Sequence, residues 1–81
     1  MDKKFLHRVI DQLVNETRVD HNTRRLHIPF PGFLFPFSSS LYLSHSFISH
    51  CENVYGLNEE EIKYVFNEYR KIINYKINNG L

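Results

Sequence analysis

The stretch Leu26–Phe37, LHIPFPGFLFPF, shapes how the rest of the chain is interpreted. It contains three prolines, one glycine, four phenylalanines and three aliphatic residues. Proline lacks the backbone N–H that a helix interior or a central strand requires. The segment is also too apolar for an ordinary exposed loop. We therefore expect residues 29–37 to run extended, covered either by the chain's own helices or by a partner.

The residues before this segment change to a two-residue period. Leu26 and Ile28 alternate with Arg25 and His27, as in a half-buried strand. The intervening DHNT sequence supplies good turn residues. We predict a β-hairpin within residues 17–28, pairing residues 17–20 with 24–28. A two-stranded hairpin is marginal alone in water, so it needs helices or another subunit behind it.

Helical periodicity predicts three helices, over residues 3–16, 40–55 and 59–78. Asp2 is the expected N-cap of the first helix, and any of Ser38, Ser39 and Ser40 can cap the second. Asn58 and Glu61 have the spacing of a capping box at the start of the third. The residues expected on the core faces are Phe5, Leu6, Val9, Ile10, Leu13, Val14, Leu43, Phe47, His50, Cys51, Val54, Ile62, Val65, Phe66, Tyr69, Ile72 and Ile73.

These elements define an expected fold class of α+β, mostly helical, in one domain spanning residues 1–81. Three helices are accompanied by a short β-hairpin and an extended Pro/Phe-rich segment, both placed between the first and second helices. Aromatic residues make up 15% of the chain, and small domains rich in large aromatics often complete their cores by oligomerisation.

The formal net charge is +1, so no global field attracts nucleic acid or membrane. The single cysteine, Cys51, fits a reducing compartment. The N-terminal residues do not resemble a signal peptide, and no apolar run is long enough to span a bilayer. The composition therefore predicts a cytoplasmic protein without a membrane partner.

The chain contains no recognisable catalytic or metal-binding constellation. Its five histidines include no pair with i, i+3 or i, i+4 spacing on a helix. We interpret His50 as a packed, hydrogen-bonded core residue and Cys51 as a buried, unreactive thiol. We therefore expect no enzyme activity, no metal and no cofactor.

A helix-turn-helix interpretation of residues 40–78 is electrostatically unfavourable. The N-terminal end of a recognition helix meets bases and phosphates, and here that end is Glu59–Glu61. These carboxylates would repel the phosphate backbone. Nucleic acid is therefore not an expected partner.

Two other surfaces are candidate binding sites. The hairpin concentrates Arg18, Arg24, Arg25 and His27, which suit a phosphate or an acidic partner surface. A solvated hairpin face is the competing interpretation. On the last helix, Tyr64 and Tyr75 lie off the core face, in register for an interface or simply flanking a wide core.

The segment His50–Ile73, HCENVYGLNEEEIKYVFNEYRKII, resembles small uncharacterised proteins of large tailed bacteriophages. The resemblance implies a phage setting, in which such proteins are usually virion components or inhibitors of host proteins. It also implies a location in the host cytoplasm or the virion. It carries no site residues.

The expected function is a non-catalytic protein–protein interaction and assembly module that binds itself or a larger partner. Its expected partner-binding residues are Phe30, Phe33, Phe35, Phe37, Tyr64 and Tyr75. Buried aromatic residues dominate interface energies, and prolines reduce the ordering cost of docking. The alternative is a small-ligand or anion-binding protein that uses the basic hairpin.

Overall fold

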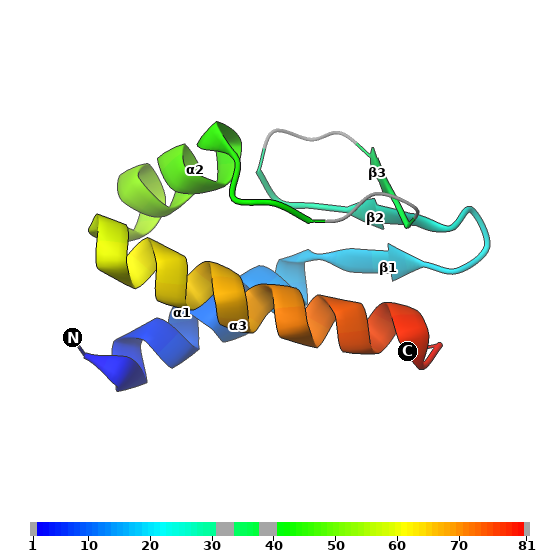
Figure 1. Cartoon of the computed structure of the whole chain (residues 1–81), viewed down its shortest axis with the longest axis horizontal. Helices are drawn as coiled ribbons and strands as arrows, with labels where there is room; N and C mark the ends of the chain where they lie inside the picture. The colour runs from blue at the N-terminus through cyan, green and yellow to red at the C-terminus, as the bar shows by residue number, and fades with distance from the viewer. Residues whose placement is uncertain (1, 31–33, 38–40, 81) are drawn as a thin grey trace.

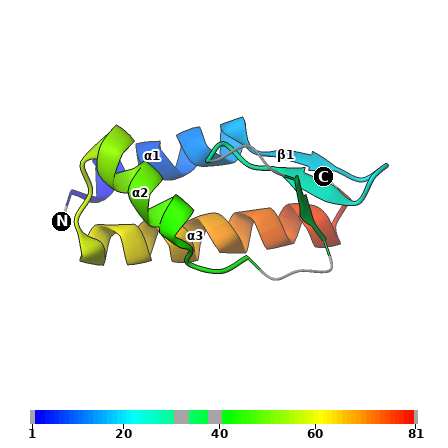
Figure 2. The same cartoon turned by 90° about the horizontal axis from the view of Figure 1, so that it is seen from above.

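A computed structural model describes residues 2–30, 34–37 and 41–80 of the chain. Its elements are α1 (Lys3–Glu16), β1 (Arg18–Asp20), β2 (Arg25–His27), β3 (Leu34–Pro36), α2 (His45–Tyr55) and α3 (Glu59–Asn78). The mostly helical α+β class, with the hairpin between the first two helices, is confirmed. Two layers form: α1 and α3 lie side by side, with α2 over one end and the sheet over the other (Figures 1 and 2). No helix among the described residues is long and apolar enough to cross a membrane.

The first and last helices begin and end where the sequence predicts. Asp2 Oδ1 accepts a hydrogen bond from the Phe5 N–H at 3.2 Å. At the start of α3, Asn58 Oδ1 accepts from the Glu61 N–H, and Glu61 Oε1 accepts from the Asn58 N–H, both at 2.9 Å. This reciprocal pair satisfies two backbone donors that a helix start otherwise leaves unpaired.

The start of α2 differs from the prediction. The helix begins at His45, and Ser44 Oγ accepts from the Phe47 N–H at 3.2 Å, so the predicted start at residue 40 is wrong. The predicted caps at residues 38–40 lie outside the described residues. The helix ends as predicted at Gly56, whose φ of 65° is the left-handed conformation that glycine adopts at little cost.

The hairpin belongs to a three-stranded antiparallel sheet with the order β1-β2-β3. Val19 pairs with Leu26, and Leu26 pairs in turn with Phe35. The sequence did not predict β3, because its prolines argue against a strand. Pro36 is tolerated because β3 lies at the sheet edge, where one side of the strand needs no ladder donor.

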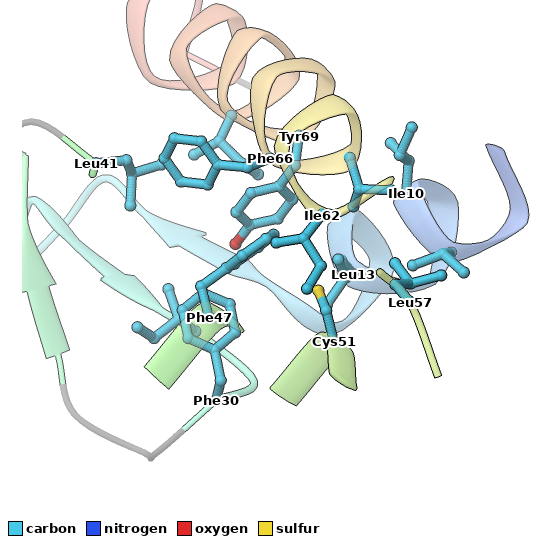
Figure 3. Close-up of a cluster of buried hydrophobic side chains, with 14 of the residues drawn as sticks. Ile10, Leu13, Phe30, Leu41, Phe47, Cys51, Leu57, Ile62, Phe66 and Tyr69 are labelled. Atoms are coloured by element: carbon cyan, nitrogen blue, oxygen red, sulfur yellow. The ribbon is translucent and has the colours of Figure 1, made fainter. Parts of the chain in front are cut away.

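The core fills the space between the two layers. Its buried apolar residues are Leu6, Val9, Ile10, Leu13, Leu26, Ile28, Phe30, Leu41, Phe47, Cys51, Leu57, Ile62, Val65, Phe66, Tyr69 and Ile73. The ring of Phe47 lies at its centre, with ring centroids 5.1 Å from Phe66, 5.2 Å from Phe30 and 5.8 Å from Tyr69 (Figure 3). Such edge-on and tilted arrangements are those that aromatic pairs prefer.

Several residues lie elsewhere than the sequence predicts. Phe30, an expected partner-binding anchor, is buried in the core with 6% of its surface exposed. It is therefore not available as an exposed anchor. Conversely, Val54 is 59% exposed and Phe5 is 39% exposed, although both were expected on core faces. In α2 the contact with the core is narrow, and only Phe47 and Cys51 are buried.

Candidate functional site

The residues able to carry chemistry are dispersed or buried. Among residues 2–30, 34–37 and 41–80, no three His, Cys, Asp or Glu side chains gather in a way that would hold a metal ion. Cys51 is fully buried, and desolvation raises the pKa of its thiol to about 12. A thiol in that environment is protonated at neutral pH and is a poor nucleophile.

His50 packs among aromatic side chains. Its ring lies between Phe30 and Tyr55, with centroid distances of 5.8 and 5.9 Å. The Nε2 atom is buried and has no hydrogen-bond partner among the described residues, so the prediction of a hydrogen-bonded His50 is wrong for this atom. The ring packs as an aromatic group at the edge of the core.

A cavity of about 470 Å³ lies on this side of α2, but its lining contains no Asp, Glu, Lys or Arg side chain. The lining consists of Pro29, Phe30, His45, Ser46, Ser49, His50, Asn53 and Val54. The cavity is open, and the unpaired Nε2 of His50 is shielded from it, since that atom exposes less than 1 Å². The cavity therefore offers a ligand only hydrogen-bonding and apolar contacts close to the protein surface.

The basic hairpin presents one polar face. Arg18 lies opposite His27 and Asp20 lies opposite Arg25, and residues directly opposite in an antiparallel pair project from the same face. Asp20 lies among these basic side chains, with its Oδ2 3.2 Å from Arg18 Nη2 and 3.9 Å from His27 Nε2. The backbone N–H of Thr23 lowers the pKa of Asp20, which keeps the carboxylate ionised. This carboxylate competes with any anion for the predicted anion-binding residues.

The hairpin tip combines a cation with an aromatic ring. Arg24 has a φ of 57°, and its guanidinium carbon lies 5.6 Å from the centroid of the Phe37 ring. His21 meets the same ring edge-on at 5.5 Å. Phe37 is half-buried against the core and is the one predicted aromatic anchor of this segment with a described position at the surface. Phe33 lies outside the described residues, and Phe35 is described only through the pairing of its backbone.

Tyr64 and Tyr75, the two expected anchors on α3, differ in their surroundings. Tyr64 is half-buried, its hydroxyl 3.0 Å from His7 Nε2 and its ring 5.5 Å from Lys3 Nζ. It therefore helps to join α3 to α1. Tyr75 is 60% exposed near the end of α3.

An apolar groove with an acidic rim lies between α2 and the start of α3. Its apolar residues are Leu43, Ile48 and Ile62, its charged residues are Glu52, Glu59 and Lys63, and its volume is about 290 Å³. We call it the α2/α3 groove. Lys63 Nζ lies 3.2 Å from Glu59 Oε1, whereas Glu52 has no ion-pair partner among the described residues. Leu43, expected in the core, is 36% exposed at its edge.

Sequence reasoning did not find this groove. The apolar pattern predicts that Leu43 is a core residue. The position of Glu59 is accounted for by the preference for carboxylates at the start of a helix. An available indication is that Leu43, just before α2, and Ile48, within it, are apolar residues additional to the two that α2 buries, Phe47 and Cys51.

Comparisons with protein-family models, with curated proteins and with solved structures give no match to this chain. The class that the fold defines is a small α+β domain in which parallel α1 and α3 carry a three-stranded sheet and a third helix.

Proposed function

We propose that this protein is a non-catalytic protein–protein interaction module that binds its partner at the α2/α3 groove. The observation that carries the proposal is the groove itself, in which Leu43, Ile48 and Ile62 line an open depression beside two carboxylates. Apolar surface bordered by charge is typical of a recognition site, with an apolar centre and a polar rim.

The chemistry of the groove specifies the kind of partner. An apolar or aromatic side chain fits against Leu43, Ile48 and Ile62, and a neighbouring Arg or Lys pairs with Glu52, which has no ion-pair partner of its own among the described residues. Glu59 shares its charge with Lys63 and so contributes less. The partner is thus a protein segment with an apolar anchor next to a basic residue. Under the phage resemblance of residues 50–73, that segment would belong to a virion or host protein.

The test is selection of short displayed peptides on the immobilised protein. We expect enrichment of peptides with an aromatic or aliphatic residue adjacent to Arg or Lys. Leu43→Ser should reduce binding of the selected peptides at least tenfold. Val54→Ser is the matched control, because Val54 is exposed on the other flank of α2, and it should leave binding unchanged. Thermal denaturation verifies that both variants are folded.

Random enrichment, or equal binding by the wild type and Leu43→Ser, would overturn the proposal.

A second candidate function is binding of a small anion, which is supported by Arg18, Arg25 and His27 on one sheet face. Inorganic phosphate should then raise the melting temperature, since a ligand that binds only the native state stabilises it. Arg25→Gln should abolish that rise.

A further inference from the structure

The α2/α3 groove and the hairpin tip lie at opposite ends of the molecule. The domain measures 37 × 22 × 17 Å along its principal axes. Along the long axis, α2 and the start of α3 occupy one end, and the turn between β1 and β2 occupies the other (Figures 1 and 2). Two surfaces placed in this way cannot meet within one copy.

The chemistry of the hairpin tip matches what the groove requires. Arg24 lies over the ring of Phe37, so an aromatic side chain and a guanidinium are already held side by side. Arg25 and Arg18 follow within the same hairpin, and of these Arg25 has no ion-pair partner among the described residues. The hairpin tip therefore combines an apolar ring with adjacent cations. This is the combination that the α2/α3 groove requires of its partner.

The charges at the two ends are of opposite sign. Around the hairpin, Arg18, Arg24 and Arg25 outnumber Asp20. Around the groove, Glu52, Glu59 and the exposed Glu60 outnumber Lys63. The hairpin tip and the groove thus carry charge of opposite sign in a chain whose net charge is only +1. Such complementarity orients approaching molecules end to end and speeds their encounter.

We propose that the partner in the groove is the hairpin tip of a second copy of this chain, in a head-to-tail contact. This inference rests on the proposed function of the groove. Arg24 of one copy pairs with Glu52 of the next, while the ring of Phe37 contacts Leu43. Because the two surfaces differ and lie at opposite ends, the contact is heterologous, and an assembly that does not close into a ring keeps a free groove and a free tip. The product is an open series of oligomers.

Sedimentation velocity over a concentration series tests this assembly. At low ionic strength we expect the weight-average mass to rise continuously with concentration, beyond that of a dimer. High salt should shift the series back towards monomer, because exposed ion pairs are screened. A monomer at every concentration, or a closed dimer that grows no further, would overturn the inference.

Charge exchange provides the sharper test. Glu52→Lys places a cation in the groove, and Arg24→Glu places an anion on the tip, so each variant alone should remain monomeric. An equimolar mixture should assemble again, because every groove then meets a tip of opposite charge. The double variant should assemble as the wild type does. Arg8→Glu, on the exposed face of α1, is the matched control and should not change assembly.

The result also separates this inference from the function on which it rests. If the wild type stays monomeric while Leu43→Ser still abolishes peptide binding, the groove binds another protein and the self-association is refuted. If neither self-association nor peptide binding depends on Leu43, both are refuted. Restored assembly in the mixture, with none in either variant alone, supports the head-to-tail contact specifically.

Discussion

The hydroxyl groups of Thr17 and Tyr69 lie 2.7 Å apart at the buried junction between α1, β1 and α3. Thr17 Oγ1 also lies 2.7 Å from the carbonyl oxygen of Leu13, which can only accept. The single hydroxyl proton of Thr17 is therefore donated to Leu13, and Tyr69 donates to Thr17. This relay gives the hydroxyl group of the fully buried Tyr69 a hydrogen-bond acceptor.

Thr17→Val should cost about 1–3 kcal/mol in the free energy of unfolding, because it leaves the buried phenol of Tyr69 without an acceptor. Tyr69→Phe should cost less, about 0.5–1.5 kcal/mol, since Thr17 keeps its bond to Leu13. Urea denaturation of both variants and of the double variant measures the coupling. Costs that simply add would contradict the relay.

Phe30→Ala should cost about 3–5 kcal/mol, because it removes a ring from the aromatic cluster around Phe47. Phe5→Ala is the matched control; that ring is 39% exposed, so its loss should cost markedly less. Denaturation midpoints compare the two. Similar small effects would show that Phe30 is an interface residue after all, as the sequence predicts.

Asn58→Ala should cost about 1 kcal/mol, the usual cost of losing an N-cap. Asn67, exposed in the interior of the same helix, gives the control: Asn67→Ala should leave stability unchanged or slightly higher, since alanine is the better helix former. Circular dichroism during thermal unfolding follows both variants. If Asn58→Ala behaves as Asn67→Ala does, the capping box contributes nothing.

Alkaline pH should destabilise the fold through Cys51 and Tyr69. Burial raises the pKa of the Cys51 thiol from 9.0 to about 12 and that of Tyr69 from 10.0 to about 12. Above its unfolded pKa each group binds more protons in the native state, so stability is complete below about pH 9 and falls as the pH rises to 12. Between its unfolded and its native pKa, each group lowers the free energy of unfolding by up to about 1.4 kcal/mol per pH unit.

Urea denaturation at a series of pH values measures this decline. In Cys51→Ala the contribution that begins near pH 9 should disappear, and the Tyr69 contribution should remain from pH 10 upwards.

The same burial predicts that native Cys51 reacts with a thiol reagent only as fast as the protein opens. Rapid labelling of the folded protein would show an accessible thiolate instead.

Local signals in the sequence were sufficient for α1 and α3, because their caps and apolar faces act within a few residues. The start of α2 was missed because Ser38, Ser39, Ser40 and Ser44 are equally good caps by residue type. The structure shows Ser44 in this role, with its Oγ accepting a hydrogen bond from the Phe47 N–H. The apolar residues Leu41 and Leu43 then precede the helix.

The candidate sites are formed by residues that are far apart in the sequence, and the local sequence pattern does not predict such contacts. Phe30 was assigned to an interface because it belongs to an apolar, proline-rich segment that either the chain's own helices or a partner must cover. In the structure α2 and α3 cover it with Phe47 and Tyr69. The α2/α3 groove forms between residues on two helices, one of which starts later than predicted. The basic hairpin was found, but the position of Asp20 among its cations follows from strand register.

The pairing of α1 with α3 has a consequence for how the chain folds. His7 contacts Tyr64 across 57 residues of sequence, and Thr17 contacts Tyr69 across 52. Bringing such distant segments together carries a large loop-closure entropy, so this mostly helical domain should fold more slowly than a bundle of sequential helices. During synthesis, α1 has no partner until the last quarter of the chain has left the ribosome, and its apolar face is exposed until then.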